Sequence, residues 1–295
     1  MAVITAGTMF PTDLVKDMYL KVKGHSSIAK MIASDPIPFK GTTEFTFSPS
    51  NKVSVVGEGA NKPAGDGVVA PVVIRPIKVV YQQRVTDEFV KCSEDERIPY
   101  LKAFADAFAI QLAEGIDEMI MHGVNPSAGT ASSVIGNNNL DYVIANYSSG
   151  ANVVAYTGAD TDVETAIDKV EGATGVILGK KLRSAIAAQT STDGAKLHPE
   201  FAWGATPDEL GGMKLDTNKS VQANSAEARA YVGDWNALKW GFAENMPIKV
   251  IEYGNPDGQG DLQQSNEVII RSEAFVGWGI LDASAFAKVN ESAAG

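Results

Sequence analysis

Alternating polar and apolar residues dominate the first third of the chain. Residues 44–48 and 52–55 alternate with a period of two, the spacing of a half-buried strand. Residues 72–85 are rich in β-branched side chains, and two prolines restrict that segment to an edge strand or a break between strands. A charged, glycine-rich segment, residues 55–63, lies between the two runs. The pattern predicts a long hairpin arm that reaches away from the body of the protein.

Such an arm has an obvious role in contacting another molecule. Edge strands pair with other chains unless they are blunted, and cationic side chains along this arm favour pairing with a selected partner. We therefore expect contacts between subunits at Gly57, Glu58, Gly59, Lys62, Pro63, Arg75 and Lys78.

The clearest helix follows the arm. Apolar residues recur three or four positions apart from Pro99 to Met121, which predicts one helix with Pro99 near its first position and Gly123 as its C-cap. At 1.5 Å per residue it is roughly 35 Å long. The polar positions, including the pair Asp117 and Glu118, are interpreted as a solvated face. The predicted core stripe consists of Phe104, Phe108, Leu112 and Ile116, packed against strands near residues 275–281.

The remainder of the chain predicts a mixed α/β layer. Residues 127–158 are rich in Ser, Gly, Asn and Tyr and are interpreted as a crossing into a second domain. Helical spacing follows at 163–170 and 182–189. Strands are predicted at 175–179, 214–216, 230–232, 248–253, 267–271 and 275–281.

Composition limits the possible functions. The 295 residues are 44% hydrophobic and 21% charged, as in ordinary globular proteins, with no apolar run of about 18 residues that could span a membrane and no signal peptide. A single cysteine, Cys92, cannot form an internal disulfide, and three histidines make no metal-binding cluster. The net charge of −11 argues against a nucleic-acid reader, which would need a basic face to displace counterions from phosphates.

The usual catalytic motifs are missing. The chain has no G-x-S-x-G elbow, no P-loop, no dinucleotide fingerprint after a strand and no H-E-x-x-H. We therefore expect a protein that is not an enzyme and needs no cofactor.

Five short motifs together resemble one family. They are the E-G-x-x-K-P tip with the following P-x-K and residues 85–89, the helix exit at residues 121–129, Gly233-Asp234-Trp235 as a strand start, residues 271–275 and residues 282–286. In this order they resemble the major capsid proteins of tailed bacteriophages of the Hong Kong 97 type. His122 stands where the family commonly has Asn.

The resemblance implies an α+β capsid fold with four parts. These are an N-terminal arm (1–38), an E-loop hairpin (39–90), a peripheral domain with a spine helix (91–130 and 270–295) and a mixed α/β axial domain (131–269). It also implies self-assembly as hexamers and pentamers into an icosahedral shell around double-stranded DNA, assembled in the host bacterial cytoplasm. The expected partners are other copies of the chain, a separate scaffolding protein, a portal and the packaged DNA.

Two alternatives fit the same patterns. One is an encapsulin-like shell of the same fold that encloses enzymes, and the other is a soluble α/β enzyme whose hairpin is a lid. Some relatives also form isopeptide cross-links between a lysine and an asparagine. Lys52 or Lys62 with Asn290 and Glu291 could be written into that scheme, but nothing in their spacing selects them.

Overall fold

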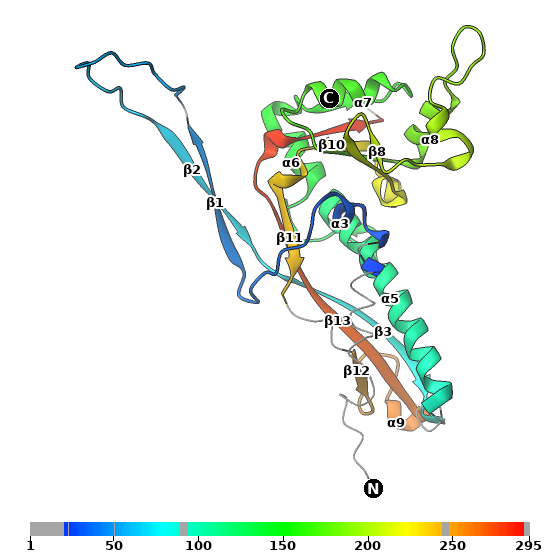
Figure 1. Ribbon diagram of the computed structural model, residues 1–295. Helices are drawn as coiled ribbons and strands as arrows, with labels where there is room; N and C mark the ends of the chain where they lie inside the picture. Colours follow the sequence, from blue (N-terminus) through cyan, green and yellow to red (C-terminus); the bar gives the residue numbers. More distant parts are fainter. Residues whose placement is uncertain (1–20, 23, 50, 89–93, 244–247, 292–295) are drawn as a thin grey trace.

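The computed structural model describes residues 21–22, 24–49, 51–88, 94–243 and 248–291. Cys92 lies outside the described residues. The described chain forms a tall body with a hairpin that projects from its middle (Figure 1).

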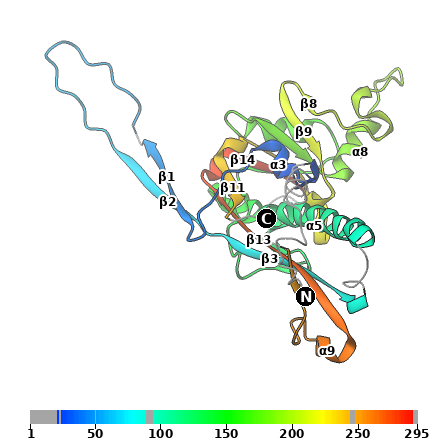
Figure 2. The ribbon, with the colours of Figure 1, turned by 60° about the horizontal axis from the view of Figure 1, so that its bottom comes forward.

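The hairpin consists of β1 (Thr42–Pro49) and β2 (Gly67–Ile74), which pair antiparallel over their whole length. Both views show it leaving the body on one side (Figures 1 and 2). The strand predicted at 52–55 is absent, since residues 51–66 form the open end of the hairpin. β2 stops before Pro76, and β3 (Ile77–Thr86) belongs to the body. The free arm is therefore shorter than the predicted E-loop segment of residues 39–90.

The lower body is built on one long strand, β13 (Glu267–Ile280). It pairs antiparallel with β3, β11 (Leu238–Phe242) and β12 (Ile248–Ile251). The two strands predicted at 267–271 and 275–281 are thus one strand. The predicted axial domain, residues 131–269, included β11 and β12, but both strands pair with β13 in the lower body. Local sequence patterns predict a strand but do not specify which strand it pairs with.

The spine helix, α5 (Glu94–His122), lies along this sheet (Figure 1). It begins earlier than predicted and contains Pro99 in its second turn, where an exposed proline forfeits one backbone hydrogen bond. The predicted stripe is buried in one core with Val276 and Trp278 of β13. The Tyr81 ring of β3 contacts two of its residues, Phe104 and Phe108.

The upper body is a six-stranded sheet in the order β6–β14–β10–β7–β9–β8. Along β7, Val176 and Leu178 face a core that includes helix residues Ala166 and Leu182, while Ile177 faces the core of the spine helix. The strands are β6 (Val153–Ala155), β7 (Gly175–Leu178), β8 (Glu209–Leu210), β9 (Met213–Thr217), β10 (Ala228–Gly233) and β14 (Phe286–Asn290).

Short helices surround this sheet, except α9 (Leu262–Ser265), which lies at the lower end of the body against β13 (Figure 1). Two of them, near residues 161 and 180, were predicted at nearly these places. The α-helices are α3 (Ser27–Met31), α6 (Leu140–Asn146), α7 (Thr161–Asp168), α8 (Lys180–Ala188) and α9 (Leu262–Ser265), and the 3₁₀ helices are η1 (Tyr147–Ser149), η2 (Pro199–Gly204), η3 (Lys219–Ser225), η4 (Trp235–Ala237) and η5 (Ala283–Ala285). A two-stranded ladder, β4 (Val124–Asn125) with β5 (Thr130–Ala131), follows the spine helix.

Three sequence interpretations are corrected here. The segment 127–158 contains α6 and β6; α6 was missed because its seven residues bury only Leu140 and Ile144. β14 pairs with β10 and β6, so the chain end does not remain in the peripheral domain. Gly233-Asp234-Trp235 joins the end of β10 to η4, where Asp234 caps Asn236, and does not begin a strand.

We predict that Phe108→Ala lowers the free energy of unfolding by roughly 3–5 kcal/mol, because Phe108 is 1% exposed and truncation leaves a cavity. Denaturant unfolding of the soluble subunit measures this loss. Val134→Ala, at an exposed position, is the matched control and should change the free energy by less than about 0.5 kcal/mol. Equal unfolding midpoints for Phe108→Ala and the wild type would show that the stripe carries no core packing.

Candidate functional site

The hairpin tip presents the predicted contact residues to solvent. Gly57, Glu58, Gly59, Lys62 and Pro63 are all exposed. The amide of Ala60 donates to the carbonyl of Gly57 at 3.1 Å, which closes a turn. The tip therefore has one ordered turn and lies away from the described part of the body (Figure 1).

The two remaining predicted residues lie at the base of the arm and differ from each other. Arg75 is exposed between β2 and β3. Lys78 forms an ion pair with Glu273 at 2.9 Å and lies 6.0 Å from the centre of the Phe275 ring. The hydrogen bond from Lys78 lowers the pKa of Glu273. Lys78 thus fastens β3 to β13 within the subunit, and the structure does not bring it together with the tip.

One face of the hairpin is apolar and uncovered. The register places Phe45 opposite Pro71 and Phe47 opposite Val69, so these four side chains share a face. Phe45 is 70% exposed and Phe47 is 65% exposed. The alternation of residues 44–48 predicts a half-buried strand, whereas both phenylalanines are mostly exposed. The spacing of the two phenylalanines was the signal that could have identified this face.

The opposite face holds the hairpin to the body at its base. Ile74 is fully buried and lies close to Gly279 of β13. Glu44 of β1 forms an ion pair with Lys239 of β11 at 2.6 Å, which raises the pKa of Lys239. The arm therefore has one face fixed on its own subunit and one face free along its length.

Asp117 forms a buried joint that the sequence analysis misplaced on a solvated face. Its carboxylate is fully buried and accepts hydrogen bonds from Ser26 Oγ at 2.6 Å, the Ser27 amide at 2.9 Å, the Ile28 amide at 3.2 Å and Asn218 Nδ2 at 2.5 Å. These donors come from the start of α3 and from the turn after β9. Burial raises the pKa of Asp117 to about 7 even though the four donors favour the charged form.

The N-terminal segment is fixed by further charges around this joint. Lys30 pairs with Asp216 at 2.8 Å, and Ser27 also donates to Asp216. Lys21 pairs with Asp106 of the spine helix. These lysines stabilise the arrangement of the subunit itself.

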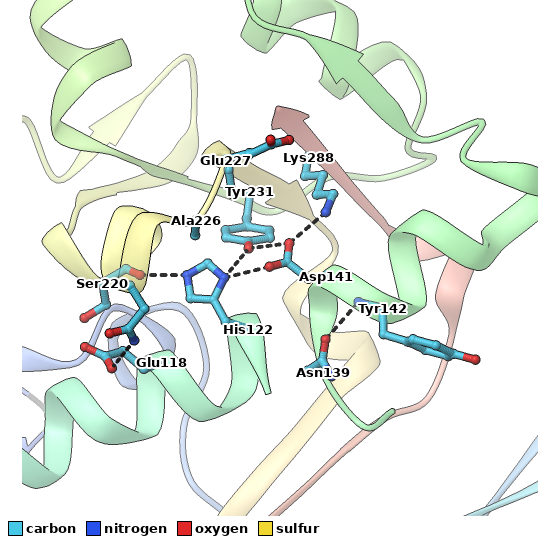
Figure 3. Close-up of polar contacts among 12 residues, drawn as sticks. Glu118, His122, Asn139, Asp141, Tyr142, Ser220, Ala226, Glu227, Tyr231 and Lys288 are labelled. Atoms are coloured by element: carbon cyan, nitrogen blue, oxygen red, sulfur yellow. Dashed lines mark hydrogen bonds and ion pairs between the residues drawn. The ribbon is translucent and has the colours of Figure 1, made fainter. Parts of the chain in front are cut away.

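His122, the last residue of the spine helix, makes a second joint (Figure 3). Its Nδ1 lies 2.7 Å from Asp141 Oδ2, and its Nε2 lies 2.8 Å from the carbonyl oxygen of Ser220. Tyr231 and Lys288 each donate to Asp141 Oδ1 at 2.8 Å. Both nitrogens face acceptors, so the protonated ring satisfies both contacts at once.

The electrostatics of this joint agree with its geometry. Burial opposes the charge on His122, but the hydrogen bond and charge of Asp141 outweigh it and raise the pKa of His122 above 6.5. Burial likewise opposes the charge on Asp141, but His122 and Lys288 lower its pKa to about 2. Every group is occupied by a partner within the subunit, as expected of a structural bracket.

Other site chemistry is limited. Among the described residues, no group of three or more His, Cys, Asp or Glu side chains is placed to hold a metal ion. No helix in the described part of the chain is both long and apolar enough to cross a bilayer. Glu291 pairs with Lys181 and Arg229, and Asn290 donates to Glu227, so the asparagine and the glutamate considered for cross-linking already have partners in the subunit. The two lysines considered with them, Lys52 and Lys62, are exposed in the open end of the hairpin.

A long helix on an extended sheet, a projecting hairpin and an α/β lobe define the Hong Kong 97-type capsid fold. The sequence pattern of the phage capsid family matches residues 6–290, and the chain belongs to that family. The fold class and the resemblance predicted from sequence are thereby confirmed, and the chain is a structural protein of the bacteriophage capsid.

Solved structures agree with this assignment. A protein of Mycobacterium phage Ogopogo is 30% identical, with a TM-score of 0.75 over 91% of this chain and 92% of that one. A protein of Gordonia phage Cozz is 23% identical, with a TM-score of 0.74 over 90% and 86%. The capsid of a native GTA particle shares the fold at 13% identity, with a TM-score of 0.66 over 90% of each chain. No curated protein matches the chain significantly.

We predict that His122 makes the subunit less stable at alkaline pH. Because its folded pKa is raised, its contribution is fully present below 6.5 and is lost as the pH rises through the folded value. The free energy of unfolding should therefore fall more in the wild type than in His122→Gln between about pH 6 and about pH 9. Titration of Asp117 affects both proteins alike, so their difference isolates His122. If the free energies of unfolding of the wild type and His122→Gln change in parallel with pH, the charged pair of His122 and Asp141 does not stabilise the fold.

Proposed function

We propose that this capsid protein assembles as hexamers and pentamers into an icosahedral shell around the double-stranded DNA of a tailed phage, with the hairpin as its main grip on the neighbouring subunit. The observation that carries the proposal is the hairpin itself. One face is fixed at the base by Ile74 and Glu44, while the face with Phe45 and Phe47 is exposed. A monomer gains nothing from such an arm, whereas a neighbour that covers it removes apolar surface from water.

The energetics favour the apolar face over the charged tip as the source of affinity. Full burial of a phenylalanine side chain is worth about 1.5–3 kcal/mol. An exposed ion pair made by Glu58 or Lys62 is worth only about 0–1 kcal/mol. The charges at the tip therefore align the arm on its neighbour and add little affinity. The stability of the closed shell comes from many copies of one modest contact.

The charge of the chain supports a container for DNA. At −11, the subunit carries a net charge that repels phosphates, so packaged DNA would be retained by enclosure and still be released. A scaffolding protein and a portal, expected from the resemblance, complete the proposed partners, and assembly takes place in the host bacterial cytoplasm.

Electron microscopy of the purified native particle tests the proposal directly. Closed icosahedral particles that contain DNA support it. Particles that hold a protein cargo and no DNA would instead favour an encapsulin-like compartment, and a small oligomer that never closes would overturn the shell.

We predict that deletion of residues 57–67 leaves a folded, soluble subunit or capsomer that does not form complete shells. Residues 57–66 are exposed and lie beyond the paired strands, and only Gly67, the first residue of β2, belongs to the ladder, where it pairs with Pro49 at the far end from the body. Their loss should therefore not disturb the core. Size-exclusion chromatography measures assembly, and thermal unfolding measures the fold. Normal particles from the variant, or an unfolded variant, would refute the gripping role.

A second prediction separates the two faces of the arm. Phe45→Thr with Phe47→Thr should reduce shell yield at least about tenfold, since burial of about 1.5–3 kcal/mol per phenylalanine is lost while strand propensity is kept. The control is Thr46→Ser, which keeps the hydroxyl that donates to Ala70. Both variants should unfold at the wild-type temperature as isolated subunits. Full assembly of the double variant would show that the apolar face is not an interface.

A further inference from the structure

Trp203 differs from every other tryptophan in the chain. Of the four tryptophans in the sequence, Trp235, Trp240 and Trp278 are each 1% exposed, whereas Trp203 is 104% exposed. An indole is the largest side chain that a protein can bury, and tryptophan is enriched at the energetic centres of interfaces. Its complete exposure on one lobe is therefore a feature that the fold of the subunit does not explain.

The backbone holds this side chain outward at a cost. Trp203 has φ of +57° and ψ of 21°, the left-handed region that side chains with a Cβ rarely adopt. The flanking residues enforce the conformation. Phe201 is buried in the core of the upper lobe, and Arg183 donates to the carbonyls of Phe201 at 2.8 Å and Ala205 at 3.3 Å. A strained residue in a braced turn is typical of a functional position.

The charges around Trp203 select the kind of partner. Residues 193–209 contain Asp193, Glu200, Asp208 and Glu209 against Lys196, and the Arg183 guanidinium adds one cation at the same turn. The surroundings are still net acidic, which disfavours phosphate-rich partners such as nucleic acid or an anionic membrane. The same lobe has a basic segment of opposite sign at the start of α8, where Lys180 and Lys181 are exposed, with Lys181 also paired to Glu291. A second copy of the chain therefore offers the complementary charge.

From the exposure, the braced turn and the charges, we propose that Trp203 is an anchor between upper lobes, buried against a neighbouring copy of this chain when capsomers form. This contact is separate from the hairpin and rests on the proposed assembly. It adds a second grip on the upper part of the subunit, whose elements α8 and β8 lie at the opposite end from α9 and β12 (Figure 1).

Intrinsic fluorescence of the full chain tests the anchor, because the other three indoles are buried in the subunit. In the dissociated wild-type subunit, acrylamide should quench one accessible, red-shifted component. In the assembled particle that component should be protected and blue-shifted. If the wild type assembles with no change in quenching, the Trp203 anchor is wrong and the proposed shell function still stands. If the wild type never assembles, the anchor and the shell function are both wrong.

Trp203→Gly separates anchoring from folding. Glycine adopts positive φ without strain, so the isolated variant should unfold at or above the wild-type temperature. Its capsomers should nevertheless dissociate at about tenfold or higher concentration than the wild type, a free-energy change of about 1.4 kcal/mol or more. Trp203→Phe, which keeps an aromatic ring, should fall between the two. Wild-type association of Trp203→Gly would overturn the proposal.

Discussion

The backbone ladder of β13 is the interaction on which the rest of the molecule depends. Its fourteen residues pair with β3 over ten positions and with β11 and β12 over shorter stretches. β3 carries the hairpin, the spine helix packs on the same sheet, and β11 leads back to the upper lobe. Backbone hydrogen bonds are directional and must be satisfied when buried, so this ladder fixes the relative positions of parts that are far apart in sequence.

Two buried polar joints complete what the ladder begins. Asp117 gathers α3, the spine helix and the turn after β9, and His122 connects the end of the helix to α6, β10 and β14. A buried polar or charged group destabilises the fold when it is unpaired and adds little net stability when it is paired. The main effect of the two joints is therefore to favour this arrangement of helices and strands over others. The joints explain how a body made of two cores remains a single unit.

Local patterns predicted the spine helix well because its apolar residues recur every three or four positions over many turns, as at Phe104, Phe108, Leu112 and Ile116. The family motifs predicted the overall fold. Neither kind of pattern could predict which strands pair with each other. Nothing near β14 shows that it joins the upper sheet, and nothing near β11 shows that it joins the lower one. Asp117 looked solvated because its burial depends on α3, a segment ninety residues away in sequence. The apolar face of the hairpin required the register of β1 and β2, which only the fold supplies.

The attachment of the hairpin makes it a lever. It is joined to the body by one short base, where Gly41 has φ of +86° and a Cβ would lie 2.5 Å from the carbonyl oxygen of Ile74. The paired strands alone extend about 26 Å from that base, at about 3.3 Å per residue. A tilt of ~10° at the base consequently moves the end of the ladder by about 5 Å, while the strands keep their hydrogen bonds. In the proposed shell, such a tilt would let one sequence meet its neighbours at several angles, which is the geometric demand that surface curvature places on identical building blocks.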